Sequence, residues 1–556
     1  MDSARFLLAI VLMVAVIVVT NLLFMPPPPA PDASVVGDTA VVAEGEATGP
    51  AVAPRPAPDG EAVAPALVPV RPAEVDLDTV IVETPLYRYG FSTGGGALVS
   101  AELLKYASYT EEGPVELVEP GAPLISYRVR AGDRVIDLSE LRFRVERPEE
   151  SAAEGGPAPV RFVYVDPESG FQASLTYTFD PESYLIRAQG RVWGSAVPPS
   201  QLLIDLGPTL RSNEADVRED ERALAYVTNG VRQGIQSVNL RSVRERRIEE
   251  GPLIWVSLKN KYFLASVLAP ELDPGTYLGG VIAEPTGQQY AVDLTATLPI
   301  ARDGGFSFEL FVGPQEYEQL MAVGRGLEDV NPYGWRVLRP IIRPLAHLIT
   351  WALVGMHNVL NISYGWVLVL FGVLIRILLW PLNARAMRSQ LKNMELQPRL
   401  KEIQDKYKND PQRLQQEMLR LYKEEGFNPF GGCLPLLIPF PVLITLFFVF
   451  QATIEFRGVS FLWLPDLSRP DPYYILPILL GVSMFVLQKL SMGTTPQQNP
   501  QMKMMLWFMP ILMVVIFINL ASGLIVYYAA MNLATIPQQL QLIKERKKLQ
   551  ARTGVA

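Results

Sequence analysis

The fold class is decided by the run Val369-Leu370-Phe371-Gly372-Val373-Leu374-Ile375-Arg376-Ile377-Leu378-Leu379-Trp380-Pro381-Leu382. This run belongs to a longer apolar segment, Tyr364–Leu382, whose length is close to the roughly 20 residues of a helix that spans a bilayer. Arg376 is the one charge in the segment, and such a charge costs about 2.5–3.5 kcal/mol on insertion scales. The segment therefore predicts a membrane-spanning helix whose arginine needs water or a polar partner to offset the insertion cost.

Two interpretations of Arg376 remain open from the residues alone. If Pro381 marks the cytoplasmic end, Arg376 lies about five residues deep, roughly 7–8 Å at helical rise, and could snorkel to the headgroups. It could instead face a wet cavity inside the helical bundle. The later apolar segments supply polar groups for such a cavity, namely Gln488, Asn519, Ser522, Tyr527, Tyr528 and Asn532. No Asp or Glu lies deep in these segments, which argues against proton pumps and ion-coupled transporters.

Four further apolar segments predict membrane spans, at Leu434–Ile454, Tyr473–Leu490, Leu506–Leu520 and Leu524–Ile543. The last two are counted separately because Ala521-Ser522-Gly523 can form a tight turn between them. Phe6–Phe24 predicts an N-terminal anchor within residues 1–25, with a cleaved signal peptide as the alternative. The total is six transmembrane helices, five of them in a core at residues 361–545.

Lysine and arginine residues orient these spans. They are concentrated at Arg385–Lys423 and in the tail Lys544–Arg552, so both regions are predicted to be cytoplasmic. Residues 383–426 have helical periodicity broken at Asn409-Asp410-Pro411, which indicates a helical hairpin. With six spans both termini are cytoplasmic, including the basic tail 546–556. The region after the first span then lies outside, in the periplasm.

That outer region contains a linker and a large β-domain. Residues 26–74 are rich in Pro and Ala and predict a disordered linker. Residues 75–330 show alternating strands such as Phe171–Phe179 separated by turn signals, which is typical of an antiparallel β-sandwich. Residues 331–360 predict an amphipathic helix lying on the membrane surface or, alternatively, packed on the sandwich.

Composition excludes several function classes. The net charge of −8 gives no basic field for nucleic acid. One cysteine and two histidines in the whole chain make a metal site of Cys and His residues implausible, and the β-domain has neither residue type. We therefore expect no catalytic residues, no metal and no cofactor, and the protein is not predicted to be an enzyme.

Several motifs in the C-terminal part resemble one family. The run Asn428-Pro429-Phe430-Gly431-Gly432-Cys433-Leu434-Pro435 is similar to the opening of the third span in YidC-type membrane protein insertases. Asp471-Pro472-Tyr473-Tyr474 resembles the start of their fourth span, and Ser522-Gly523-Leu524-Ile525-Val526-Tyr527-Tyr528 resembles their sixth. Arg376 followed by Trp380-Pro381-Leu382 matches the family's groove arginine. The anchor and β-domain resemble the Gram-negative form, whose periplasmic domain is a β-supersandwich similar to sugar mutarotases.

The resemblance implies a mechanism. Arg376 would lie in a hydrophilic groove of an inner-membrane insertase and chaperone, and would attract acidic residues of a substrate's translocated segment. The groove residues would be Arg376, Gly372, Gln488, Asn519, Ser522, Tyr528 and Asn532. Gly372 is a departure, since some relatives have a polar residue there. The substrate's apolar helix would slide along Leu436, Phe440, Phe508 and Ile511 into lipid.

The resemblance also implies partners. These are nascent membrane proteins, membrane lipids, the Sec translocon and, through the hairpin and the basic tail, the ribosome. The short tail departs from relatives with extended ribosome-binding tails. Three alternative functions are a transporter, a membrane-anchored carbohydrate-binding protein and a folding chaperone, and the sequence does not separate the last from an insertase.

Overall fold

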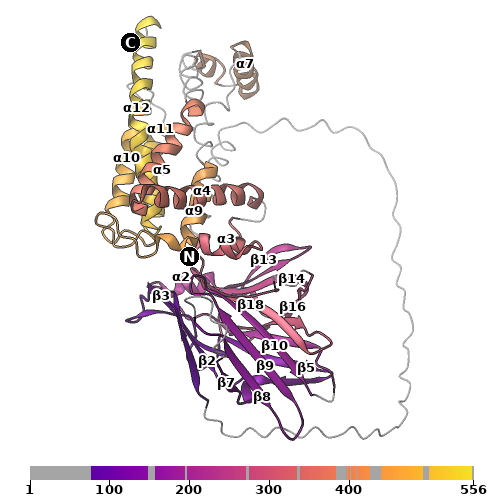
Figure 1. The fold of residues 1–556 in the computed structure, drawn as a ribbon. Helices are drawn as coiled ribbons and strands as arrows, with labels where there is room; N and C mark the ends of the chain where they lie inside the picture. Colours follow the sequence, from indigo (N-terminus) through magenta and orange to yellow (C-terminus); the bar gives the residue numbers. More distant parts are fainter. Residues whose placement is uncertain are drawn as a thin grey trace, which may run out of the picture.

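The computed structural model describes residues 77–147, 157–194, 197–270, 275–334, 338–383, 396, 399–400, 402–408, 410–425, 440–492 and 500–553. The predicted anchor Phe6–Phe24, the whole of the linker 26–74 and the first part of the hairpin lie outside these ranges. The described chain has two parts, a β-domain and a bundle of helices above it (Figure 1).

The β-domain contains eighteen strands in the described residues, and every strand pairing is antiparallel. This confirms the antiparallel β-domain predicted from the alternating sequence. The strands are β1 Thr79–Glu83, β2 Tyr87–Ser92, β3 Leu98–Ala107, β4 Pro114–Glu116, β5 Ile125–Ala131, β6 Arg134–Asp137, β7 Arg144–Glu146, β8 Val160–Val165, β9 Gln172–Phe179, β10 Leu185–Trp193, β11 Gln201–Leu206, β12 Ala225–Gly230, β13 Gly234–Asn239, β14 Arg247–Lys259, β15 Phe263–Leu268, β16 Leu278–Pro285, β17 Val292–Pro299 and β18 Gly305–Pro314.

Strand β14 joins two runs of strands into one hydrogen-bonded system. One run goes β7-β8-β9-β10-β18-β15-β14-β12-β13. The other goes β14-β16-β17-β11-β5-β3-β2-β1. The first half of β14 pairs with β16 and its second half with β12 and β15, with a register irregularity between Glu250 and Leu253. Such irregularities bend a strand, and this one lets β14 belong to both runs.

Aromatic side chains fill the space between the strands. Tyr87 and Tyr89 point to the same face because they are two residues apart, and their rings stack at 3.9 Å. The Tyr177 hydroxyl donates to the Tyr127 hydroxyl at 2.7 Å, so these buried polar groups have partners. Strand β9 shows the period-two pattern, with buried positions alternating with half-buried or exposed ones, whereas β12 and β15 are buried at every position.

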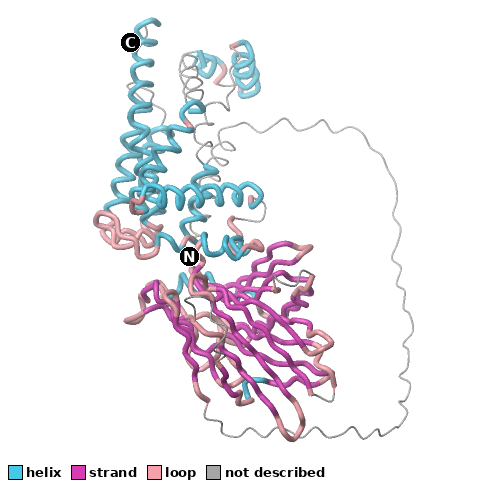
Figure 2. Tube along the Cα trace, in the orientation of Figure 1, coloured by secondary structure: helices cyan, strands magenta, loops and turns pink. Residues whose placement is uncertain are grey.

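The helical part lies beside the strands of the β-domain (Figure 2). Its apolar helices are α4 Arg339–Leu360, α5 Tyr364–Leu378, α9 Phe440–Ala452, α10 Ile475–Met492, α11 Pro500–Phe517 and α12 Ser522–Thr553, and α7 Pro411–Glu424 is a charged helix. The β-domain adds α2 Val217–Ala223 and α3 Tyr317–Val323 on the side that faces the bundle. Helix α10 packs against both α11 and α12.

Membrane-spanning length is reached by one bent pair of helices. Within the residues that the structure describes, no single helix is both long and apolar enough to cross a membrane. Helices α4 and α5 meet that criterion together, across a bend of 120°.

Helix α4, within the predicted amphipathic region 331–360, is held on both of its faces. Arg343 and His347 bond to Asp329 of the β-domain, with His347 Nε2 at 2.8 Å from Asp329 Oδ1. Burial alone would raise the pKa of Asp329, but His347 and Arg343 hold it below its ordinary value. The opposite face buries Ile349 and Leu353 in the cluster that includes α5 and α9 residues. Helix α4 therefore links the β-domain to the bundle.

The loop 453–474 is the second link between the two parts. Arg457 Nε lies 2.7 Å from Glu214 Oε1, and the two side chains are 3% and 11% exposed. The guanidinium also lies over the ring of Tyr109, at 4.3 Å, and the Tyr109 hydroxyl donates to Asp466 at 2.7 Å. Burial raises the pKa of Glu214, and Arg457 opposes that rise. A buried pair with added hydrogen bonds fixes geometry, so this loop is held firmly on the β-domain.

We predict that Arg457→Ala destabilises the junction by about 3–5 kcal/mol, because it leaves the Glu214 carboxylate buried without its cation. Thermal unfolding of the detergent-solubilised protein should show a lower midpoint, with faster proteolysis between the β-domain and the bundle. Arg144→Ala is the matched control, since its pair with Glu146 is exposed and is worth at most about 1 kcal/mol. Equal midpoints for the two variants would contradict the prediction.

Candidate functional site

Arg376 lies in the last turn of α5 and turns toward α12. Its side chain is half-buried, and one terminal nitrogen, Nη2, donates to the Gln538 side-chain oxygen. Its Nε is buried and has no hydrogen-bond partner among the described residues. The arginine is thus held by a neutral amide, and no ion pair with a described carboxylate compensates its charge.

Gly372 explains how Arg376 comes so close to α12. A Cβ atom at Gly372 would lie 2.9 Å from the Tyr527 carbonyl oxygen and 3.3 Å from the Ala530 Cβ. Only a residue without a side chain fits this approach of two helix backbones. One turn earlier on α5, Leu368 contacts the position of Gly523. Along α5, Leu368, Gly372 and Arg376 therefore face Gly523, Ala530 and Gln538 of α12 in the same order, so the two helices run parallel.

The polar side chains of α10 and α12 meet on another side of α12. Asn532 donates to the Ser483 hydroxyl at 3.2 Å, and Gln488 on α10 has a buried side-chain oxygen without a partner among the described residues. Tyr528 packs its ring against Phe517 at 5.7 Å. Arg376 and Gly372 thus share the interface of α5 with α12, whereas Asn532 bonds across the interface of α10 with α12.

Asn519 and Ser522, also predicted for the groove, lie at the other end of α12. The Ser522 hydroxyl donates to the Asp466 carbonyl at 3.1 Å, and its amide donates to the Arg469 carbonyl at 2.8 Å. Since Gly523 lies opposite Leu368, this end is about eight residues, roughly 12 Å, from Arg376 along the helices. The structure therefore does not bring these two residues together with Arg376, because the turn before α12 directs them to the loop 453–474.

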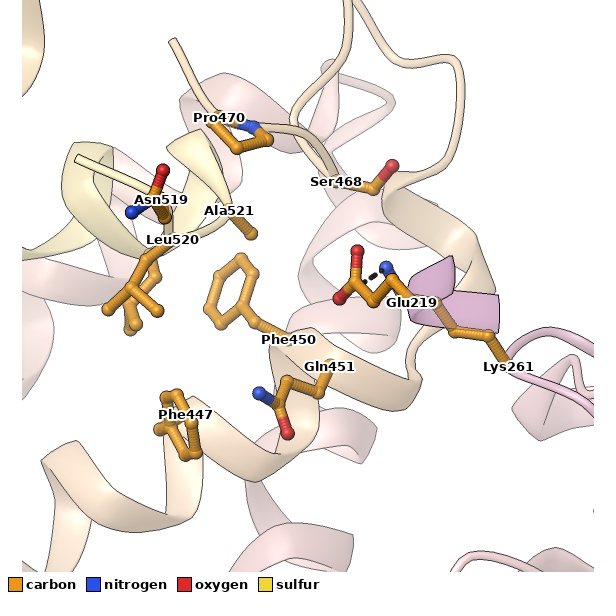
Figure 3. Close-up of a pocket in the computed structure, with 11 residues that line it drawn as sticks. Glu219, Lys261, Phe447, Phe450, Gln451, Ser468, Pro470, Asn519, Leu520 and Ala521 are labelled. Carbon is orange, nitrogen blue, oxygen red and sulfur yellow. Dashed lines mark ion pairs between the residues drawn. The ribbon is translucent and has the colours of Figure 1, made fainter. Parts of the chain in front are cut away.

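Asn519 instead lines a small cavity where the bundle meets the β-domain (Figure 3). The cavity holds about 30 Å³, enough for a water molecule. Its polar wall includes the pair of Lys261 with Glu219 at 3.2 Å, and its apolar wall includes Phe447 and Phe450. The cavity lies at the junction between the two parts, and its volume is too small for a peptide segment.

The predicted apolar slide is described in part. Phe508 and Ile511 on α11 are 50% and 60% exposed, and Trp507 and Val515 extend the same exposed apolar surface. Leu436 lies outside the described residues, and Phe440 is the first residue of α9. Helix α11 thus presents apolar side chains outward, where an apolar substrate segment or lipid can contact them.

Gln538 is the residue that the sequence reasoning missed. It is 2% exposed and follows Pro537 within the last predicted span, Leu524–Ile543. The signal was available, because a glutamine inside an apolar span is as costly to leave unpaired as the polar residues that were selected. The sequence also did not predict the ion pair of Arg457 with Glu214, because these two residues are 243 positions apart in the chain.

These features define a class: a helical bundle in which the half-buried Arg376 has no acidic partner among the described residues, joined to a large antiparallel β-domain. Comparison with known families agrees with this class. Residues 79–348 match the family model described as the YidC periplasmic domain, and residues 355–550 match that of the 60Kd inner membrane protein.

Whole-length relatives extend these matches. The chain is 32% identical over 484 residues to the membrane protein insertase YidC of Chlorobaculum parvum, covering 83% of this chain and 81% of the relative. It is 30% identical over 506 residues to that of Chlorobaculum tepidum, covering 86% and 84%. The chain therefore belongs to the YidC family of membrane protein insertases.

Two solved structures are also similar in outline. A crystal structure of an active YidC insertase with its first transmembrane domain resolved covers 83% of this chain and 92% of that one, at 19% identity and a TM-score of 0.35. A galactose mutarotase related enzyme from Lactobacillus acidophilus covers 42% and 97%, at 10% identity and a TM-score of 0.29. Because both TM-scores lie below 0.5, the assignment rests on the sequence matches.

Membership of the family settles the broad function. The protein is a membrane protein insertase of the inner membrane, with a periplasmic β-domain and a helical insertase region, and it is not an enzyme. Its substrates are membrane proteins. The predicted function, class and location are confirmed at this level.

Close packing at Gly372 gives a testable prediction. Gly372→Ala should push α5 away from α12, lower the thermal midpoint of the purified protein and weaken insertion, because the new methyl group would lie 2.9 Å from a backbone oxygen. We expect a cost of about 1–3 kcal/mol. Gly355→Ala in α4 is the control, since nothing beyond the adjacent residues and backbone of its own helix lies within 4 Å of its Cβ position and alanine favours the helix. A Gly372 variant as stable as the Gly355 variant would refute this packing argument.

Proposed function

We propose that Arg376 receives the acidic residues of a substrate's translocated segment in a hydrophilic groove. The single observation that carries this proposal is the half-buried guanidinium, which bonds to a neutral amide and forms no ion pair with a described carboxylate. A cation in this state can form charge-assisted hydrogen bonds with an incoming carboxylate, and these are roughly twice as strong as neutral ones. Water in the groove lowers the desolvation cost of both charges.

The remaining groove residues have different roles in this proposal. Gly372 lets α5 approach α12, and Gln488, Tyr528 and Asn532 supply polar groups on the neighbouring interface. Asn519 and Ser522, which were included from the sequence, are better suited to closing the bundle at the β-domain end. We therefore propose a groove that is closed toward the periplasm and opens toward the cytoplasm and lipid.

The apolar part of the substrate would leave along the outer surface of α11 and α9. Phe508 and Ile511 are exposed there, as an apolar slide requires, and we retain Leu436 and Phe440 in the proposal. Burial of the substrate's apolar helix in lipid supplies the free energy, at roughly 25 cal/mol per Å² of apolar surface. Neither a nucleotide nor a metal is needed for this step.

The domain boundaries and the topology belong to the same proposal. Six spans place residues 75–330 and the loop 453–474 on one side of the membrane, and the contact of Arg457 with Glu214 supports that arrangement. The parallel course of α5 and α12 is also expected when the first of the five core spans and the last cross in the same direction. The hairpin 383–426 and the basic tail 546–556 then lie in the cytoplasm.

The proposal also includes two larger partners, the Sec translocon and the ribosome. The family resemblance suggests cooperation with the Sec translocon. The basic tail and the charged surface of α7, which includes Arg413 and Arg420, suit contact with a ribosome.

The test is insertion of a single-span substrate with an acidic translocated segment into vesicles depleted of their own insertase. Arg376→Ala should lower insertion about tenfold or more, because a hydrogen bond to a charged group contributes about 1.5–3 kcal/mol. Arg376→Lys should retain most of the activity, since it keeps the charge. Lys489→Ala removes an exposed cation of α10 and should insert like wild type. Normal insertion by a folded Arg376→Ala variant would refute the electrostatic mechanism.

A further inference from the structure

Gln538 occupies the position where a counter-ion for Arg376 would stand. It lies on α12, is 2% exposed, and its side-chain oxygen accepts from the Arg376 guanidinium. The close approach at Gly372 fixes the distance between the two helices, so the contact does not depend on a mobile loop. The side chain is therefore both fixed in place and directed at the one charge of α5.

The important property of residue 538 is that its side chain is neutral. A glutamine oxygen accepts a hydrogen bond but carries no charge, so it orients the guanidinium without neutralising it. A glutamate of the same length would form a partly buried ion pair, in which each charge is satisfied by the other. A substrate carboxylate displaces a neutral acceptor readily, whereas it would compete on equal terms with a resident carboxylate.

We propose that Gln538 is a positioning residue that orients the Arg376 guanidinium toward the groove while keeping its charge available, and that it thereby sets the preference for acidic translocated segments. This inference rests on the proposed role of Arg376 and adds a residue to it. It assigns no contact between Gln538 and the substrate. Its effect is exerted through the hydrogen bond to Arg376.

Gln538 thus differs from a residue that only satisfies a buried polar group. A purely structural partner would affect every substrate alike, because it would act on the stability of the α5–α12 interface. A partner that controls an available charge affects substrates in proportion to the acidic residues they carry. The dependence on substrate charge is therefore the readout that separates the two roles.

The experiment uses the full-length protein in depleted vesicles and two single-span substrates that differ only in the translocated segment, one with three acidic residues and one with none. Gln538→Glu should lower insertion of the acidic substrate about tenfold, the change expected when a charge-assisted hydrogen bond is lost, and leave the neutral one within about twofold. Gln539→Glu is the matched control, since it introduces the same charge on the next residue of α12, and it should retain insertion of both substrates.

A second variant guards against misfolding of the glutamate form. Gln538→Met keeps the length of the side chain and removes the acceptor, so it should lower insertion of the acidic substrate alone, by about two- to tenfold. An equal loss for both substrates, or acidic insertion at the wild-type level in both variants, would overturn the role of Gln538. Arg376→Ala in the same assay separates the two proposals. If the Gln538 prediction fails but Arg376→Ala impairs insertion of the acidic substrate, only the role of Gln538 is wrong. If Arg376→Ala inserts that substrate normally, the proposed groove mechanism is wrong as well.

Discussion

The desolvation of one guanidinium is the constraint on which the rest of the helical part depends. Arg376 can remain charged among apolar helices only if polar groups or water reach it, and the protein supplies the neutral amide of Gln538 for that purpose. The amide can reach it because Gly372 lets α5 lie directly against α12. Acidic residues are absent from α5, α9, α10 and α11 and from α12 before Lys544, so no carboxylate of these helices competes for the charge.

The β-domain gives this bundle a fixed end. Arg457 and Tyr109 hold the loop 453–474, while Asp329 holds the polar side of α4. The turn before α12 is bonded to the same loop through Ser522. The ends of the helices nearest the β-domain are therefore cross-linked by hydrogen bonds and ion pairs, whereas Arg376 lies toward the opposite end. This asymmetry suits a groove that opens on one side only.

The sequence predicted the local elements better than the contacts between distant ones. Alternation over Phe171–Phe179 predicted a strand that the structure has at Gln172–Phe179, because burial on one face enforces a period of two. The role of β14 in two runs of strands could not be predicted, since it depends on pairings with strands far along the chain. The sequence grouped Ser522 with Arg376 and Asn532 because polarity alone does not say how far along a helix each residue lies, and the structure places Ser522 at the end of α12 that meets the loop 453–474. Gln538 could have been found by the same rule.

Chemical rescue of charge at position 376 tests the central claim most directly. Arg376→Cys in a Cys433→Ser background would be treated in inverted vesicles with a cationic aminoethyl thiosulfonate or with an anionic sulfonatoethyl reagent, each added from the cytoplasmic side. We expect both reagents to modify the cysteine and only the cationic one to restore insertion of an acidic substrate. Absence of modification from the cytoplasmic side, or equal restoration by the anionic reagent, would contradict a water-accessible positive charge as the basis of insertion.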